Sequence, residues 1–385
     1  MELTMTYLRS ISSSVLILCA ACSVERTPDQ SAIEEIEVDH FVSSSPENVS
    51  WGWFPIDKDP ILTIQSGQTV QVDALSQAGA SQEEHPVDFL GKLGLPPEEI
   101  HQDVIDFWNS REGRPREGRS SHVITGPIYV EGAMPGDVLE IQILDVTTRA
   151  SWGINNTSPT GGIFSENYPG AKMGYHPAGM TGSVRHLIRT TETDSGEVAL
   201  FSRDIRVPLA PFMGILAVAP DPKIGDPGVT DSKIQGSRPP GIFGGNLDVK
   251  DLKKGATLYL PVLQPGALFY VGDPHGAQGD GEVSGTAIEQ SLTGVFRFVL
   301  HPNKEITAPR AENDTHYIVM GIDLDLDRAA VRATQEAVNF LVEEMGMTPD
   351  AALSLSSIAL DLRVSEVVDL TQVVSGFIPK SIFSR

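Results

Sequence analysis

The sequence predicts a mainly β fold with an α+β carboxy-terminal portion, arranged as a β-sandwich or a distorted barrel of short strands. Between residues 50 and 300, short β-prone runs alternate with glycine and proline, whereas helical periodicity appears mainly near the end of the chain. The chain has 385 residues, of which 40% are hydrophobic, so it is long enough to bury a sizeable core.

The first 38 residues predict an export signal and a tether. Arg9 precedes an apolar run at residues 15–18, which ends in small residues before Cys22. This order of charged, apolar and small segments is typical of a secretory signal, and the run is too short to span a bilayer permanently. We therefore expect a signal peptide over residues 1–21 and a polar tether over residues 22–38.

The residues around Cys22 also predict where the protein goes. The small residues before it resemble a bacterial lipoprotein processing site, and Ser23 after it favours the outer membrane. Cys19 stands where leucine is usual, which leaves ordinary signal cleavage open. We expect an exported bacterial protein, either a lipoprotein anchored through Cys22 at the periplasmic face of the outer membrane or a periplasmic or secreted protein. That lipid is the only membrane contact expected.

Residues 39–250 predict a β-rich region with an insertion at residues 78–121. Within the insertion, residues 97–110 predict a helix. The following stretch, residues 111–119, mixes arginines with glutamates and is interpreted as a solvated loop rather than a recognition patch.

Three glycine turns each begin an alternating strand, at Gly67, Gly136 and Gly255. Asp137 follows the second turn and could pass for a ligand. Because Gln68 and Ala256 occupy the equivalent positions, we interpret Asp137 as a turn residue.

Residues 251–385 predict an α+β region. The runs at residues 255–263 and 267–271, joined by a Pro-Gly turn, indicate a β-hairpin that ends at a polar cluster. Further on, Asp327 can cap a helix that runs to Glu344. Thr348 and the proline after it predict the start of a second helix, which continues to about residue 362.

The polar cluster at residues 272–282 is the strongest indication of a functional site. Asp273 and His275 are two residues apart, which places both side chains on one face of an extended chain. The interspersed glycines allow tight turns and a close approach to a ligand. A surface turn would explain glycine, aspartate and proline, but it would not need His275, Gln278 and Glu282 as well.

Composition and missing motifs exclude several classes of protein. The net charge of -23 argues against a nucleic-acid partner, because binding a polyanion requires a basic surface. Both cysteines lie in the first 22 residues, so signal cleavage leaves no free thiol for catalysis. The chain has no Gly-x-Ser-x-Gly elbow and no His-Glu-x-x-His pair. If the chain is a hydrolase, these exclusions leave a water, activated by a carboxylate or by a metal, as its nucleophile.

The segment Gly244-Gly245-Asn246-Leu247-Asp248, the run at residues 272–282 and Thr286-Ala287-Ile288-Glu289 together resemble the acetamidase/formamidase family of bacterial amide hydrolases. The resemblance covers most of the chain from about residue 40 and includes residues 50–52, 122–126, 211–214 and 379–380. It departs from the family in the export signal and in residues 78–121, which are longer and more charged. The resemblance implies hydrolysis of a linear amide, like formamide or acetamide, to a carboxylate and ammonia by a homo-oligomer.

Amide hydrolysis requires a nucleophile, stabilisation of an oxyanion and a proton for the leaving nitrogen. We expect Asp273, His275 and His122 to hold a divalent cation, zinc or calcium, and Glu282 to act as general base; the resemblance also places His122 near the pocket. Asn246 or Gln278 would donate to the oxyanion or orient the amide. Asp280 and Glu289 are reserve ligands. Without a metal, Glu282 and His275 would act as a base and acid pair.

Two other functions remain open from sequence. The chain could be a surface-anchored binding protein for small molecules on an amidase scaffold, or a hydrolase of a larger amide whose entrance is shaped by residues 78–121. The intact run at residues 272–282 favours an enzyme, and the release of ammonia from short amides would discriminate between these functions.

Overall fold

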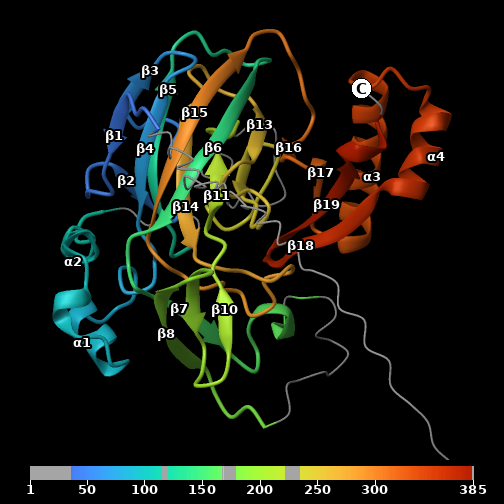
Figure 1. Ribbon diagram of the computed structural model, residues 1–385. Helices are drawn as coiled ribbons and strands as arrows, with labels where there is room; N and C mark the ends of the chain where they lie inside the picture. Colours follow the sequence, from blue (N-terminus) through green and yellow to red (C-terminus); the bar gives the residue numbers. More distant parts are fainter. Residues whose placement is uncertain (1–35, 115–119, 167, 169–178, 222–234, 384–385) are drawn as a thin grey trace, which may run out of the picture. The chain divides into compact units, whose positions relative to one another are not determined.

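Two large β-sheets pack against each other and enclose the main hydrophobic core, and a smaller sheet lies below them in Figure 1. The computed structural model describes residues 36–114, 120–166, 168, 179–221 and 235–383. The mainly β prediction is confirmed. The sheets in this described part are open, so the fold is the predicted sandwich and not the distorted barrel that was its alternative.

The first sheet has nine strands in the order β1-β4-β15-β6-β13-β16-β17-β19-β18. Except for the parallel pair β1 and β4, neighbouring strands run antiparallel. Its strands are β1 (His40–Val42), β4 (Thr69–Ala74), β6 (Val138–Thr148), β13 (Thr257–Pro261), β15 (Leu292–His301), β16 (Arg310–Glu312), β17 (His316–Asp323), β18 (Asp361–Asp369) and β19 (Thr371–Pro379).

The second sheet has the order β12-β11-β14-β5-β2, with β3 pairing in parallel to β5. The third sheet has the order β10-β9-β8-β7. The strands of the second are β2 (Val49–Trp51), β3 (Leu62–Ile64), β5 (Val123–Val130), β11 (Phe212–Ala217), β12 (Gly244–Asn246) and β14 (Phe269–His275). Those of the third are β7 (Trp152–Thr157), β8 (Val184–Thr193), β9 (Gly196–Leu200) and β10 (Arg206–Pro208).

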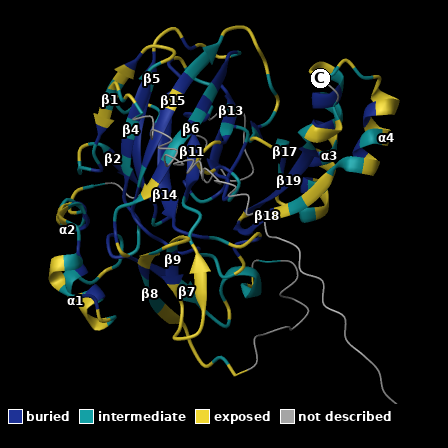
Figure 2. Ribbon diagram, in the orientation of Figure 1, coloured by how far each residue is buried: buried dark blue, intermediate teal, exposed yellow. Residues whose placement is uncertain are grey.

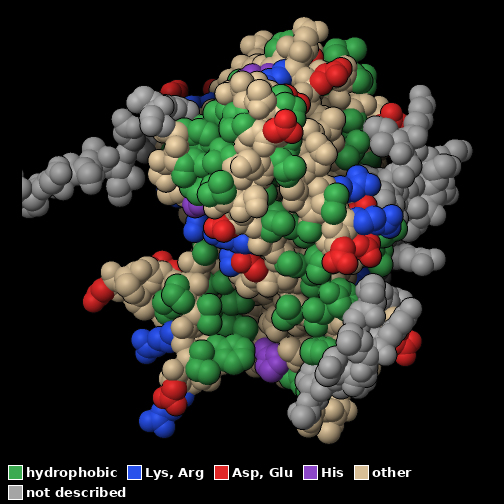
Figure 3. Space-filling model, turned by 90° about the vertical axis from the view of Figure 1, so that its right-hand side faces the viewer, with side chains coloured by type: hydrophobic (Ala, Val, Ile, Leu, Met, Phe, Trp, Pro, Cys, Tyr) green, Lys and Arg blue, Asp and Glu red, His purple; other side chains and the backbone are tan. Residues whose placement is uncertain are grey.

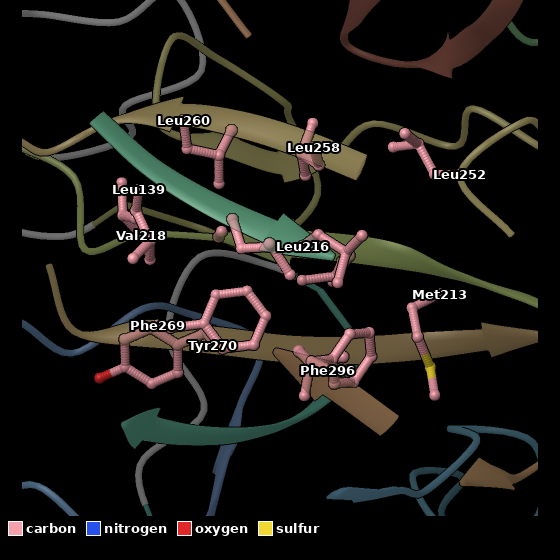
Figure 4. Packing of buried hydrophobic residues seen from close by; sticks show 14 of the residues in the cluster. Leu139, Met213, Leu216, Val218, Leu252, Leu258, Leu260, Phe269, Tyr270 and Phe296 are labelled. Carbon is pink, nitrogen blue, oxygen red and sulfur yellow. The ribbon is translucent and has the colours of Figure 1, made fainter. Parts of the chain in front are cut away.

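The core between the two large sheets is built from aliphatic and aromatic side chains of facing strands. Figure 4 shows Leu258 and Leu260 of β13 on one side and Met213 and Leu216 of β11 close by. Phe269 of β14 contacts aromatic rings of β15, with ring centroids 4.9 and 6.0 Å apart. Strands from both sides of residue 250 therefore share one core.

The prediction of a hairpin at residues 255–271 is wrong, although both predicted strands exist. β13 pairs with β6 and β16 in the nine-stranded sheet, whereas β14 pairs with β11 and β5 in the other large sheet. The connection between them has left-handed backbone at Gly266, Ala267 and Leu268. The chain therefore crosses from one sheet of the sandwich to the other, and β14 carries the polar cluster as predicted.

Strand β6 has the predicted alternation, with Leu139, Ile141 and Ile143 buried. Asp137, just before it, is a turn residue. One of its carboxylate oxygens accepts the backbone N–H of Met134 at 2.9 Å, and the other accepts that of Asn303 at 2.8 Å. The side chain thus ties the start of β6 to the turn after β15.

The Asp137→Asn substitution replaces one acceptor oxygen by an NH2 group that faces a backbone donor. We expect it to lower the free energy of unfolding by roughly 1–3 kcal/mol, the cost of losing a buried charged hydrogen bond. Denaturant titration measures this change, with the exposed Asp59→Asn as the matched control, expected within about 0.5 kcal/mol of wild type. Equal stabilities of the two variants would contradict the turn role.

Two carboxy-terminal helices, α3 (Leu326–Glu343) and α4 (Pro349–Ala359), belong to the same region as β17, β18 and β19. The cap of α3 is Asp325, not the predicted Asp327, because the Asp325 side chain accepts the Arg328 N–H at 3.0 Å. Thr348 caps α4 as predicted. Helix α3 lies so close to β17 that a Cβ on Gly321 would come within 2.1 Å of the Ala329 carbonyl oxygen.

Figure 3 shows the face on the side of α3 and α4, where hydrophobic side chains are interspersed with acidic and basic ones. Large exposed apolar residues of this region include Val331 on α3 and Ile358 on α4.

The insertion contributes α1 (Pro86–Lys92), the short 3-10 helix η1 (Pro97–Glu99) and α2 (Gln102–Asn109). The helix predicted at residues 97–110 exists as α2, but it begins only at Gln102, because extended backbone at Ile100 and His101 separates it from η1. Leu90 and Phe107 are buried in a second apolar cluster with Trp51, while much of the surface of α1 is exposed (Figure 2). The insertion is therefore packed onto the sandwich rather than loosely attached.

The predicted signal peptide, Cys22 and most of the predicted tether lie outside the described residues. Among the residues that the structure describes, no helix has the length and apolar character needed to cross a membrane.

Candidate active site

The candidate active site surrounds His275, the last residue of β14. The His275 side chain is fully buried, and the edge of its ring packs against Phe212 of β11 with centroids 5.2 Å apart. Its Nε2 atom lies 3.4 Å from Asp273 Oδ2 and 3.4 Å from Glu289 Oε1. Glu282 Oε1 is 3.9 Å from the same nitrogen. The structure therefore brings together the predicted residues Asp273, His275, Glu282 and Glu289.

Glu289 lies between the small sheet and the six-stranded sheet. Its backbone bridges Ile154 of β7 on one side and His275 of β14 on the other. One carboxylate oxygen accepts the Ala287 N–H at 3.0 Å, and the other accepts Gln77 Nε2 at 2.7 Å. These bonds fix the orientation of the carboxylate, so the predicted reserve ligand is a central member of the site.

His122 stands beside Asp273, just before β5. Its Nε2 atom is 3.6 Å from Asp273 Oδ2, and its Nδ1 atom is 3.2 Å from the hydroxyl oxygen of Ser237. The imidazoles of His122 and His275 therefore approach the same oxygen of Asp273.

The sequence interpretation missed two carboxylates of the site, Asp248 and Asp369. Asp248 Oδ1 lies 3.8 Å from His275 Nδ1, and the residue is fully buried. Asp369 is the last residue of β18, almost a hundred residues after His275. Asp248 belongs to the Gly244–Asp248 segment quoted above, which was a usable signal; nothing near Asp369 in the sequence marks it.

Glu366 holds the turn that delivers Asp369. It is fully buried, interrupts the regular register between β18 and β19, and accepts the backbone N–H groups of Val368 and Asp369 at 3.1 and 2.9 Å. Gly281, the residue before Glu282, forms a parallel β-bridge with Glu366. This bridge connects the loop that carries Glu282 to the carboxy-terminal strands.

The two carboxamides expected to contact substrate are committed to other site residues. Asn246 Nδ2 donates to Asp369 Oδ2 at 2.6 Å. Gln278 Oε1 lies 2.9 Å from His275 Nδ1, and Gln278 Nε2 donates to the Asp248 carbonyl at 2.8 Å. Both therefore orient catalytic candidates. Asp280 lies outside the cluster, with its carboxylate 3.1 Å from Lys250 Nζ.

Three carboxylate residues of the site have left-handed backbone, which is unfavourable for non-glycine residues. The φ angles are 49° at Asp248, 49° at Asp273 and 43° at Glu282. Such conformations cost of order 1–3 kcal/mol and persist where the surrounding structure enforces them, frequently at functional sites. Here each one aims a carboxylate toward His275.

The charges of the cluster strongly influence one another. Burial and the neighbouring Asp369 raise the pKa of Glu282 well above its usual value, and burial together with Glu282 does the same for Asp248. Burial opposes ionisation of Asp273, but the imidazoles of His122 and His275 outweigh it and hold the pKa of Asp273 low. For His275, Asp273 and Glu289 outweigh burial and raise the pKa. Burial thus favours the neutral forms of Glu282 and Asp248, whereas Asp273 and His275 stabilise each other's charged forms.

These buried groups could hold a metal ion. Three sets offer ligand atoms within 4.8 Å of one another: Asp248 with Asp273 and His275, His275 with Glu282 and Glu289, and Asp248 with Glu282 and Asp369. Within the described residues, His275 Nε2, Asp273 Oδ1 and both Asp248 carboxylate oxygens are buried without a hydrogen-bond partner. Buried polar atoms are normally paired, so these atoms fit a cation.

Two cavities adjoin the cluster. The first has a volume of about 450 Å³ and is lined by His122, Glu289 and Asp369 together with residues of the insertion. The second has a volume of about 630 Å³ and is lined by Gln278 and Glu282 together with apolar residues of β8, β10 and the loop after β14.

Comparison with known proteins places this site in a family. The family model described as Acetamidase/Formamidase matches residues 116–228 and 232–385, which is more than half of the chain and includes every carboxylate of the cluster. The chain belongs to the acetamidase/formamidase family. A formamidase from Methylophilus methylotrophus is 27% identical over 317 residues, covering 68% of this chain and 77% of the relative.

Other members show the same likeness. An acetamidase from Mycolicibacterium smegmatis is 30% identical over 202 residues, covering 42% of this chain and 49% of that protein. The crystal structure of an acetamidase from Bacillus halodurans superposes with a TM-score of 0.68 at 30% identity, covering 89% of this chain and 98% of that one. The predicted family and fold are thereby confirmed.

Gly214 of β11 provides a test of the geometry of the site. A Cβ at this position would lie 2.4 Å from Asp248 Oδ1 and 3.0 Å from the His275 ring. We expect Gly214→Ala to displace both side chains and to lower kcat by roughly a hundredfold, because misplacements of about 1 Å can have that effect. Steady-state hydrolysis of acetamide measures the loss.

The matched control is Gly91→Ala in helix α1, where a Cβ meets nothing within 4 Å. This change should keep wild-type activity and stabilise the helix by roughly 0.5–1 kcal/mol. A folded Gly214→Ala protein with wild-type kcat would show that Asp248 and His275 need not be held as the structure has them.

Proposed function

We propose that this protein hydrolyses the C–N bond of a linear amide to a carboxylate and ammonia. The observation that carries the proposal is the buried cluster in which Asp273, Glu282 and Glu289 converge on His275 next to two cavities. The relatives named formamidase and acetamidase support this reaction for a chain with the same family match. The cluster brings a proton acceptor and possible cation ligands to one place, which favours an enzyme over a binding protein.

We infer that Asp273, His275 and His122 hold a divalent cation, zinc or calcium, with Glu289 as a further ligand. The unpaired Nε2 of His275 and Oδ1 of Asp273 support this assignment. When bound, the cation would polarise the amide carbonyl and lower the pKa of a water. Gln278 contributes by holding His275 through Nδ1, which leaves Nε2 directed at the cation.

Glu282 is the proposed general base. Burial and Asp369 raise its pKa, which makes its carboxylate a stronger proton acceptor than an exposed glutamate. It takes a proton from water as the new C–O bond forms, and passes it to the nitrogen as the C–N bond breaks, so that ammonia leaves. Asp369, held by Asn246 and Arg238, lies beside Glu282 and helps to keep that proton available.

Ammonia release from formamide and acetamide tests the reaction and the base together. Glu282→Gln keeps the shape of the side chain but cannot accept a proton, so we expect kcat to fall roughly a hundredfold or more with KM little changed. Asp280→Asn, in the same loop but paired with Lys250, is the matched control and should retain wild-type kcat. If folded wild-type protein released no ammonia from any short linear amide, the proposed reaction would be wrong.

Removal of metal tests the cation. We expect a strong chelator to abolish activity and zinc or calcium to restore it, while thiol alkylation has no effect. His275→Ala should lose bound metal, measured by elemental analysis, together with activity, whereas Asp280→Asn should keep its metal. Full activity in protein shown to be metal-free would leave Glu282 and His275 as a base and acid pair.

A further inference from the structure

The cavity beside His122 is larger than formamide or acetamide requires. Those amides have three and four non-hydrogen atoms, whereas a cavity of about 450 Å³ falls in the range of roughly 300–1,000 Å³ typical of sites for larger organic ligands. The space beyond the reacting carbonyl is therefore available to the rest of a longer substrate.

The walls of this cavity differ in charge. Glu289, Asp369 and His122 form one wall, which carries two of the proposed cation ligands, and each of them is tied to a neighbouring residue. Arg185 of β8 and Arg238 also line the cavity. Arg238 Nε donates to Asp369 Oδ1 at 3.1 Å and Arg238 Nη2 donates to the Val368 carbonyl at 2.7 Å, so both bind groups of the protein itself.

Arg185 differs because no described carboxylate lies within ion-pair distance of it. Its guanidinium carbon lies 5.3 Å from the centre of the Phe89 ring, which is a cation–π contact between described residues. Phe89 belongs to α1 of the insertion and lines the same cavity. The insertion therefore supplies an aromatic surface on which a cation is held. Phe89 also precedes residue 116, where the match to the family begins.

We propose that the substrate is a linear amide whose acyl chain ends in an anionic group, such as a carboxylate, and that Arg185 binds this group. The inference rests on the proposed amide hydrolysis and adds the substrate class. A planar guanidinium binds a carboxylate through two parallel hydrogen bonds, and stacking on Phe89 restricts its orientation. Arg185 is exposed and lines this cavity without a described acidic partner, so its charge is available to an anion from outside even in a chain with a net charge of -23.

The test compares two amides of the same size and shape. Succinamate carries a carboxylate at the end of its chain, and 4-methylpentanamide replaces the two carboxylate oxygens by methyl groups. For the wild-type protein we expect kcat/KM to be at least about tenfold higher for succinamate. Arg185→Gln should lower this ratio by about tenfold or more, mainly through the KM for succinamate, because a charged hydrogen bond to the substrate is lost.

Two further variants separate local recognition from general charge. Arg203→Gln removes the same charge from an exposed arginine that lines neither cavity, and it should leave both rates within about twofold of wild type. Phe89→Leu keeps an apolar side chain but removes the ring, and it should lower the ratio less than Arg185→Gln does.

The outcomes distinguish this inference from the proposed function. If 4-methylpentanamide is hydrolysed as well as succinamate, or if Arg185→Gln and Arg203→Gln change the ratio equally, the anionic substrate is wrong while amide hydrolysis stands. If the wild type releases ammonia from neither compound nor from acetamide, both proposals fall together.

Discussion

The rest of the structure depends on keeping His275 buried between carboxylates. An isolated charge in the interior costs several kcal/mol, so such a cluster persists only where surrounding groups hold each member in place. Here Gln278 holds one ring nitrogen, Phe212 packs against the ring, and Gly214 leaves the space that a side chain would fill. The site thus constrains which residues strands β11 and β14 can carry next to His275, and these strands in turn hold His275 in place.

Much of this arrangement could be predicted from local sequence. The alternation of β6, the cap and proline of α4 and the helix of the insertion are local patterns, and each was found. The site run was recognisable because His275, Gln278 and Glu282 are not needed in an ordinary turn. Asp137 was separated from the site by comparison with Gln68, and its backbone contacts agree with that interpretation.

The errors came from information that local patterns do not contain. Two apolar runs joined by Pro-Gly have the same local sequence whether they pair with each other as a hairpin or with strands of two different sheets. Asp325 and Asp327 can both cap a helix, and only the hydrogen bond to Arg328 decides between them. Asp369 joins the site through a turn fixed by Glu366, a long-range arrangement without a motif. Asn246 and Gln278 were placed correctly near the site, but their partners could not be deduced from spacing.

The place of Asp369 at the end of β18 also affects the order in which the molecule is assembled. The run that carries His275 leaves the ribosome long before the last two strands, and the bridge between Gly281 and Glu366 can form only after those strands exist. A nascent chain that lacks them has the imidazole and most of its carboxylates, but its centre is incomplete. The cluster is thus completed only when strands β18 and β19 pair, after all its other members have been synthesised.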